Sequence, residues 1–386
     1  MKHSAFLIFI SIVLVIYAGI NFYIYRRGWA ALTGLGGYRY IVLGIFLFLV
    51  LAYPVGRFAE SLKCCGFTQA LVFIGSFYLG LMVYLFFMIL IIDIFRLGNH
   101  FIHFFPSFIT QNPQRSSHIA ALFVAVIAVL TIFFGHINAL HPRIRTLEME
   151  INKRAGNLKQ LNIVMASDIH LGTVIHNSRL LKIVDKINAL DPDIVLFPGD
   201  VVDEDVAPLK NQNMEKSFRK IKSRYGVYAI TGNHEYIGGV KQAVEYIRTG
   251  DITVLQDSVI KVADAFYIIG RKDLMSERVD GGRKKLADIM EAVDHSYPLI
   301  LMDHQPFHLE VAQRNGIDLQ LSGHTHDGQL FPFNLITDLV YELSWGYKQK
   351  GSTHYYVSCG VGTWGPPVRV GNRPEIVRII LKFAEN

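Results

Sequence analysis

Residues 317–326 read IDLQLSGHTH and join a short apolar run to two histidines that are one residue apart. The run is typical of a short buried strand, and Gly323 follows it as a turn residue. His324 and His326 then lie just past the carboxyl end of that strand. Two interpretations are open: a loop that happens to hold two histidines, or two metal ligands that diverge toward two ions.

The C-terminal part of the chain repeats this pattern, with short apolar runs alternating with amphipathic helical segments. Further buried strands are predicted at LNIVMAS (161–167), DIVLFPG (193–199), GVYAITG (226–232), YPLILMD (297–303) and HYYVSCG (354–360). Helices are predicted over 178–190, with Ser178 as N-cap, over 214–225 and over 240–248. An edge strand is predicted over 146–151. Alternating strands and helices predict an α/β domain.

Polar residues follow five of these strands. In open α/β sheets, ligands bind beyond the carboxyl ends of the strands, so residues at these positions are expected to meet. The five pairs are Asp168 and His170, Asp200 and Asp203, Asn233 and His234, Asp303 and His304, and His324 and His326. Any one pair is a weak signal, whereas five at the same structural position are a strong one.

The residue types indicate metal chemistry. Carboxylates, imidazoles and an amide oxygen without a thiolate suit hard to borderline divalent ions. We predict two ions, with manganese as the first choice and iron or zinc as alternatives. The predicted ligands form two sets that share one carboxylate: Asp168, His170 and His326 on one ion, Asn233, His304 and His324 on the other, and Asp200 between them. A water between two such ions, about 3.5–4 Å apart, would become the nucleophile for in-line attack on phosphorus.

Two further residues, His234 and Asp203, are predicted to take part in catalysis without binding a metal. His234 is left without a metal and would stand near the leaving oxygen, where it could donate a proton. Asp203 would hold the His234 imidazole in its tautomer. His176 and Arg369 are candidate substrate-binding residues, with an ordinary ion pair as the alternative for Arg369.

The N-terminal part has a different composition, with four long charge-free stretches. We predict transmembrane helices over about 5–25, 40–56, 70–92 and 118–138, since a bilayer needs about 20 apolar residues per helix. The chain then divides into an all-α membrane domain (1–142) with four spans and an α/β domain (143–386). The protein is therefore expected to be a multi-pass integral membrane protein that contacts the lipid bilayer.

The distribution of charge limits the functions that remain. The net charge is +6, and residues 1–142 account for it with eight basic and two acidic residues, while the remainder is balanced. A neutral C-terminal domain carries no electrostatic footprint for nucleic acid, so no nucleic-acid partner is expected. Seven near-membrane basic residues on the side of the α/β domain, against five on the other, favour the cytoplasmic face. The oligomeric state stays open.

The ordered motifs resemble those of the calcineurin-like metallophosphoesterases. They are Asp-x-His at 168, Gly-Asp-x-x-Asp at 199, Gly-Asn-His-Glu at 232, the downstream His304, and Gly-His-x-His at 323. The resemblance covers about residues 143–386 and implies a four-layer α/β/β/α sandwich with a dinuclear centre. Membrane helices before this domain, and the tail at 360–375, resemble the branch of transmembrane proteins with a metallophosphoesterase domain.

Several functions agree with these features. The leading one is a membrane-bound two-metal phosphoesterase that cleaves a phosphate ester or pyrophosphate of a lipid-linked substrate. By resemblance alone, one alternative is cleavage of UDP-2,3-diacylglucosamine in lipid A synthesis. A second alternative is a phosphodiesterase for a nucleotide or cyclic nucleotide. A third is a non-enzymatic sensor or transporter with a metal-binding domain.

Overall fold

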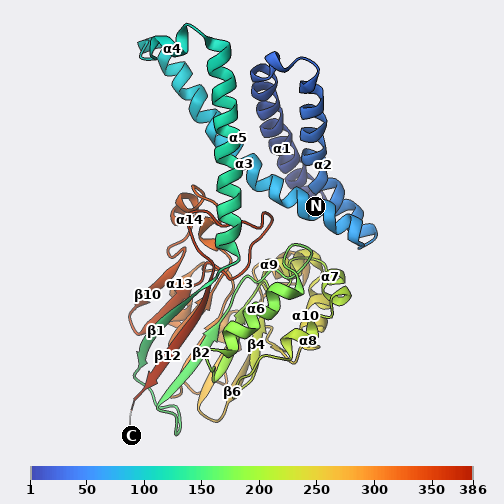
Figure 1. Ribbon diagram of the computed structural model, residues 1–386. Helices are drawn as coiled ribbons and strands as arrows, with labels where there is room; N and C mark the ends of the chain where they lie inside the picture. The colour runs from blue at the N-terminus through green and yellow to red at the C-terminus, as the bar shows by residue number, and fades with distance from the viewer. Residues whose placement is uncertain (1, 385–386) are drawn as a thin grey trace. The chain divides into compact units, whose positions relative to one another are not determined.

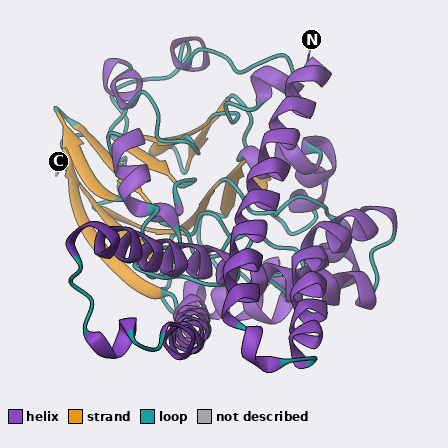
Figure 2. Ribbon diagram, turned by 90° about the horizontal axis from the view of Figure 1, so that it is seen from above, coloured by secondary structure: helices purple, strands orange, loops and turns teal. Residues whose placement is uncertain are grey.

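The computed structural model describes residues 2–384, with side chains described from residue 11 onward except at residue 35. Contacts divide the chain into two compact units, Met1–His136 and Ile137–Asn386. We call them the N-terminal unit and the C-terminal unit. The first is helical, and the second combines helices with strands (Figure 1, Figure 2).

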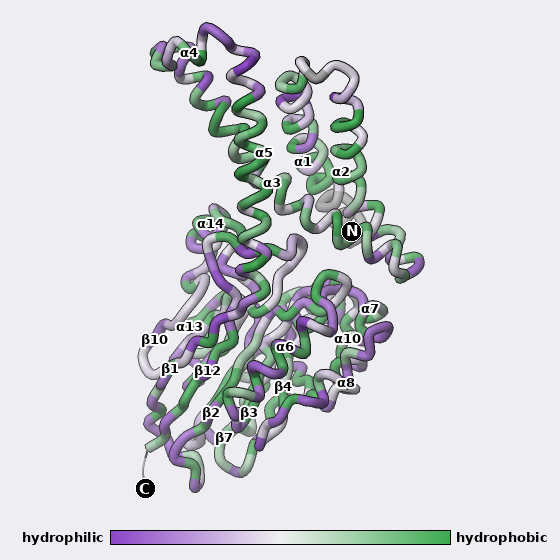
Figure 3. Tube along the Cα trace, viewed as in Figure 1, coloured by the Kyte–Doolittle hydropathy of each residue, from purple (hydrophilic) through white to green (hydrophobic). Residues whose placement is uncertain are grey.

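The N-terminal unit consists of long helices joined by short turns. Its elements are α1 (Lys2–Ala31), the 3-10 turn η1 (Thr33–Leu35), α2 (Tyr38–Leu62), α3 (Gly66–Ile102), α4 (Ser107–Thr110) and α5 (Pro113–Ala139), which ends in the C-terminal unit. Among the described side chains, α2, α3 and α5 are long and apolar enough to cross a membrane. Their tubes are mostly hydrophobic in colour (Figure 3). The first predicted span, over 5–25, lies in α1, and its first side chains fall outside those described.

Helices α2 and α3 approach each other closely at glycines. At Gly75 in α3, an added Cβ would collide with the backbone of Tyr53 in α2. At Gly56 in α2, it would come 2.8 Å from the backbone nitrogen of Val72. Small residues let helix backbones approach in this way within membranes.

The C-terminal unit contains two six-stranded sheets. The first has the order β1-β12-β2-β3-β4-β5 and the second β10-β11-β9-β8-β7-β6. The first sheet comprises β1 (Arg143–Ile151), β2 (Gln160–Met165), β3 (Ile194–Pro198), β4 (Val227–Ile230), β5 (Thr253–Val254) and β12 (Glu375–Phe383). The second comprises β6 (Ser258–Val262), β7 (Phe266–Gly270), β8 (Leu299–Met302), β9 (Leu319–Ser322), β10 (Gly346–Lys350) and β11 (Thr353–Val357).

Parallel pairing aligns the strand ends that matter for the site. Strands β2, β3, β4 and β5 are parallel neighbours, as are β7, β8, β9 and β11. Strands β12 and β2 pair antiparallel, and the β1 edge strand pairs with β12 in parallel. The loops that follow β2, β3 and β4 therefore leave the same edge of the first sheet, and those that follow β8 and β9 leave the same edge of the second.

Helices lie in the connections between the strands. They are α6 (Asn177–Asn188), α7 (Ala207–Asn211), α8 (Glu215–Phe218), α9 (Asn233–Gly238), α10 (Val240–Arg248), α11 (Ser276–Val279), α12 (Leu286–Ile289), α13 (Leu309–Arg314) and α14 (Asn334–Val340).

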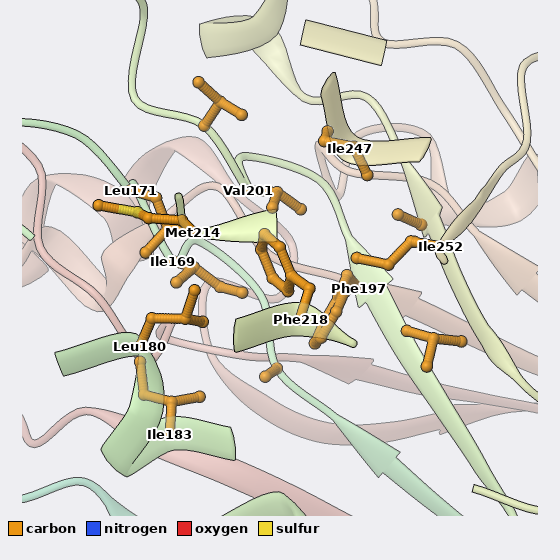
Figure 4. Close-up of a cluster of buried hydrophobic side chains, with 14 of the residues drawn as sticks. Ile169, Leu171, Leu180, Ile183, Phe197, Val201, Met214, Phe218, Ile247 and Ile252 are labelled. Carbon is orange, nitrogen blue, oxygen red and sulfur yellow. The ribbon is translucent and has the colours of Figure 1, made fainter. Parts of the chain in front are cut away.

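The two faces of each sheet pack into different cores. In β2, Ile163 and Met165 lie in a core shared with the second sheet, whereas Val164 lies in a core with Leu180 of α6 and Ile247 of α10. Figure 4 shows part of this outer core, with Phe197 against Phe218. A third core joins the second sheet to α12 and α13. Successive strand residues point to opposite faces, so these three cores separate four layers and confirm the α/β/β/α fold.

Two helix predictions need correction. The first helix begins at Asn177, and the residue before it is His176, so Ser178 is not its N-cap. The helix predicted over 214–225 contains only the four residues of α8, Glu215–Phe218. A longer helix is not needed to bury the apolar residues there, because Met214 and Phe218 already reach the same core from a single turn. The edge strand and α10 are confirmed.

The close approach of α2 and α3 predicts a stability effect. Gly75→Ala should lower the melting temperature of the detergent-purified protein by several degrees, because overpacking costs about 1–3 kcal/mol. Gly44→Ala, in α2, is the control, since no described atom lies within 4 Å of its added Cβ. Equal melting temperatures for the two variants would contradict the close packing.

Candidate metal centre

Loops from both sheets converge at one site in the C-terminal unit. They are the loops after β2, β3 and β4 in the first sheet and those after β8 and β9 in the second. Five of the predicted ligand residues have left-handed backbone angles, with φ between 50° and 73°: Asp168, His170, Asp200, His324 and His326. Residues other than glycine seldom adopt this conformation, and such strain concentrates at functional sites.

One group of side chains consists of Asp168, His170 and His326. Each offers a ligand atom within 4.8 Å of the others, and all three residues are buried. The Nε2 atoms of the two histidines are 2.9 Å apart, and Asp168 Oδ1 lies 3.7 Å from His326 Nε2. These are the three residues predicted to share one ion.

A second group consists of Asp200, His304 and His324. His304 Nε2 lies 3.1 Å from Asp200 Oδ2. The remaining predicted member, Asn233, joins the group through His324, whose Nδ1 is 2.8 Å from the Asn233 side-chain oxygen.

Asp200 lies between the two groups. Its Oδ2 atom is 3.1 Å from His304 in one group and 3.8 Å from His170 Nε2 in the other. Its Oδ1 atom accepts a hydrogen bond of 2.9 Å from the backbone nitrogen of His234. One carboxylate is thus placed where it could contact two ions at once.

The geometry fits divalent metal ions. A zinc-like ion binds histidine nitrogens at about 2.1 Å. Two such nitrogens at a right angle about the ion are about 3.0 Å apart. The Nε2 atoms of His170 and His326 are separated by nearly this distance. His304 donates its Nδ1 hydrogen to the carbonyl oxygen of Pro198, 2.8 Å away, which leaves Nε2 as its ligand atom. Asp168 Oδ2 is buried and has no hydrogen-bond partner among the described residues.

The charges of the groups agree with this reading. Burial, together with the charge of His304, lowers the pKa of His324 to about 3. Burial, together with Arg369, lowers the pKa of His326 well below its ordinary value. Both imidazoles are therefore neutral, the form that binds a metal. Burial opposes a proton on His304, but Asp200 raises the pKa of His304 well above its usual range. His304 therefore carries a proton beside Asp200, and this positive charge occupies a place where a metal cation would also be stabilised.

The tautomer of His234 is set by a different atom from the one predicted. His234 Nδ1 lies 2.6 Å from the backbone carbonyl oxygen of Asp203 and 3.5 Å from its carboxylate. The carbonyl can only accept, so Nδ1 carries the hydrogen and Nε2 is available for proton transfer. The Asp203 carboxylate also lies 3.4 Å from Nδ1 of His170. Carboxylates commonly orient a ligand histidine in this way.

Glu235 joins the loops that carry the ligands. It is fully buried, and its carboxylate accepts hydrogen bonds from the backbone nitrogens of Asp200, Val202 and Gly232, at 3.2, 2.9 and 2.7 Å. The loops after β3 and β4 are thereby held together. This agrees with a supporting role and not with one in contact with substrate.

The predicted substrate contact of Arg369 is not supported. Arg369 is fully buried, and its guanidinium donates to the carbonyl oxygens of His326 and Gly362, at 3.0 and 2.7 Å. Arg369 therefore positions a ligand loop. His176 precedes α6, where its carbonyl oxygen accepts hydrogen bonds from Arg179 and Leu180. Its contact with substrate stays a prediction.

Two aromatic residues lie beside histidines of the site. The Trp364 ring lies edge-on to His234, with ring centres 5.6 Å apart, and remains 54% exposed. The ring centre of Tyr341, which follows α14, is 6.2 Å from that of His324. Neither follows a strand of the kind that carries the ligands, so the strand-end pattern could not identify them.

Asp303 forms two buried ion pairs beside the predicted ligand His304. Its two carboxylate oxygens bind Arg271 and Arg283, each at 2.8 Å, and all three side chains are largely buried. This pairing fixes the start of the loop that presents His304.

The position of the Asp203 carboxylate predicts its effect on metal binding. Asp203→Asn should weaken Mn²⁺ binding about 10–100-fold, as for other carboxylates that orient a ligand histidine. The Asp203 backbone contact with His234 would remain. Titration calorimetry of the purified protein measures this, with Asp264→Asn as the control because the Asp264 side chain is 96% exposed. An unchanged affinity in Asp203→Asn would contradict the assignment.

Comparison with known proteins adds to this geometry. Residues 161–328 match the family described as calcineurin-like phosphoesterase. A transmembrane protein with metallophosphoesterase domain from Danio rerio is 34% identical over 283 residues, covering 70% of this chain and 63% of that protein. The chain thus spans less than two thirds of that relative.

Another relative matches along its whole length. An uncharacterized metallophosphoesterase from Campylobacter jejuni is 33% identical over 392 residues, covering 98% of this chain and 99% of that protein. Among solved structures, a 5'-nucleotidase precursor from Thermus thermophilus is 13% identical with a TM-score of 0.38, covering 58% of this chain and 54% of that one. The chain belongs to the calcineurin-like phosphoesterases, which are metal-dependent hydrolases.

Proposed function

We propose that the chain is a membrane-bound phosphoesterase that uses two divalent ions to hydrolyse a phosphate ester or pyrophosphate. The observation that carries this proposal is the position of Asp200 between two groups of ligand atoms. Asp168, His170 and His326 would hold one ion, and Asn233, His304 and His324 the other. Manganese is the first choice, and iron or zinc are alternatives.

When bound, the ions would lower the pKa of a water and neutralise charge on the phosphoryl oxygens. The residues of the chain provide the remaining functions. His234 donates from Nδ1 to the Asp203 carbonyl, so its Nε2 can transfer a proton to the leaving oxygen. Burial lowers the pKa of His234, but Asp200 and Asp203 outweigh it and raise that pKa above its ordinary value. A raised pKa suits a group that must donate a proton.

We further propose a lipid-linked substrate, with the active site on the cytoplasmic face. Three candidate membrane spans lie on the same chain as the metal centre, so substrate at a bilayer surface would be within reach. Counted with all four predicted spans, the near-membrane basic residues favour the cytoplasmic side. A soluble nucleotide is the alternative, in which case the helices serve only as an anchor.

The ligand assignment can be tested by substitution. Asp200→Asn and His304→Gln should each reduce Mn²⁺-dependent hydrolysis of bis-p-nitrophenyl phosphate by roughly a hundredfold or more, since even residues outside the ligand set contribute about 10–100-fold. Both variants should also bind less metal in elemental analysis. His308→Gln is the matched control, because its side chain is 71% exposed. Full activity in both ligand variants would overturn the proposal.

The substrate class calls for a separate comparison. The purified protein should hydrolyse a lipid-linked pyrophosphate, such as UDP-2,3-diacylglucosamine, with a higher kcat/KM than p-nitrophenyl phosphate or a cyclic nucleotide. The reason is that binding energy from remote parts of a true substrate raises the rate at the reacting centre. Faster turnover of a soluble nucleotide would favour the anchored alternative. Bound metal without turnover of any ester would favour a sensor.

A further inference from the structure

Helix α14 (Asn334–Val340) presents its apolar face outward. Leu335, Ile336 and Val340 are each 55% exposed and Leu339 is 88% exposed, and none of the seven residues, all described, is buried. A surface helix of a soluble domain normally turns its apolar stripe toward the core. We call Leu335, Ile336, Leu339 and Val340, with the 51% exposed Phe331 just before them, the α14 face.

Two polar residues of α14 make local hydrogen bonds, and Asp338 is itself exposed. Ser344 donates a hydrogen bond of 2.5 Å to Asp338 Oδ1, and the Thr337 hydroxyl donates to the backbone oxygen of Asn334. Positions 335, 336, 339 and 340 lie on one side of a helix with 3.6 residues per turn. The apolar exposure is therefore a continuous strip and not a set of scattered residues, and such strips mark interaction sites.

Hydrogen bonds connect this strip to the end of a candidate membrane span. The last residues of α5 belong to the C-terminal unit, and Asn138 donates to the carbonyl oxygens of Arg369 and Asn372, at 3.0 and 2.7 Å. Val370 lies in the same loop, and its carbonyl oxygen accepts a hydrogen bond of 2.8 Å from the backbone nitrogen of Phe331.

Charges beside the end of α5 fit a lipid surface as well. A cavity of about 330 Å³ there is lined by His141, Arg179, Lys182 and Lys186, with Asp185 as the acidic residue in the lining. Arg179 donates to the carbonyl oxygen of Ala139, the last residue of α5, at 2.7 Å. Basic residues next to a membrane span attract anionic headgroups.

We infer that the α14 face lies in the bilayer interface, as a second membrane contact next to the point where α5 leaves the membrane. A bilayer matches the apolar strip, the basic cavity beside the end of α5 and the candidate span together. Tyr341 follows the strip directly and lies near His324, so the contact would open the metal centre toward lipid. This consequence for substrate rests on the proposed phosphoesterase function, whereas the membrane contact does not.

Lipid quenching tests the contact without any need for activity. Leu339→Cys in a Cys64→Ser, Cys65→Ser background would carry a bimane label, because the remaining Cys359 is buried. The full chain is reconstituted into phosphatidylcholine and phosphatidylglycerol vesicles with brominated lipid. The label should be quenched roughly twofold or more by the lipid and protected from iodide, as expected for an interfacial helix.

Two further labels act as controls. Leu335→Cys lies one turn away on the same strip and should behave like position 339, which guards against a local effect of one label. Asp264→Cys, with a side chain that is 96% exposed at the turn after β6, should be quenched by iodide and not by lipid. If iodide quenched the labels at 335 and 339 as strongly as the label at 264, the inference would be overturned. Protection of the labels at 335 and 339 from both iodide and brominated lipid would also overturn it and would indicate a protein partner.

The link to substrate has its own test. Leu335→Asp with Leu339→Asp should lower hydrolysis of a vesicle-embedded lipid pyrophosphate roughly tenfold, because charge opposes insertion. Hydrolysis of p-nitrophenyl phosphate should stay unchanged. Val279→Asp, at a 58% exposed apolar residue in α11, is the matched control. If the wild-type chain hydrolyses no ester, the proposed function fails while the quenching result still decides the membrane contact. An equal rate on the lipid substrate in wild type and the double variant would overturn the link.

Discussion

The burial of Asp200 between two sets of imidazoles is the constraint on which the rest of the site depends. Asp168, Asp200 and His304 are each at most 1% exposed, and taking a charge out of water costs several kcal/mol per ion even after the protein relaxes. A proton on His304 offsets this cost in part, because it places positive charge 3.1 Å from Asp200. Divalent cations would offset it far more, and the neutral His324 and His326 are already suited to bind them.

Holding these groups together requires the two sheets to end at one place. Parallel order in each sheet brings the carboxyl ends of β2, β3 and β4 together, and likewise those of β8 and β9. The left-handed residues that follow are then stabilised by buried partners. Glu235 joins two of the loops through three backbone nitrogens, and Arg369 holds the His326 loop through its carbonyl oxygens. The strain at the ligands is thus balanced by contacts made outside the ligand set.

These two kinds of contact differ in how far the sequence can predict them. The ligands follow buried strands, and a strand leaves a local apolar pattern, so Asp168, Asp200 and His324 could be found by their place in the chain. The role of Arg369 depends on His326, which is 43 residues away, and nothing local distinguishes a buried arginine from one that binds phosphate. The tautomer of His234 depends on a backbone carbonyl, which every residue has. The extent of the helix predicted over 214–225 was wrong because single turns can also bury Met214 and Phe218.

Arg369 also connects the metal centre to the end of the membrane span. Its side chain holds His326, while its own carbonyl oxygen accepts from Asn138 at the end of α5. Asn372 repeats this arrangement, because its side chain donates to the carbonyl oxygen of His326 and its carbonyl oxygen accepts from Asn138. Arg369 and Asn372 thus each bind the His326 loop through their side chains and the end of α5 through their backbone carbonyl oxygens. Each of these two residues therefore links the end of α5 directly to His326. The loop that holds Arg369 and Asn372 therefore binds both the end of α5 and the predicted ligand loop.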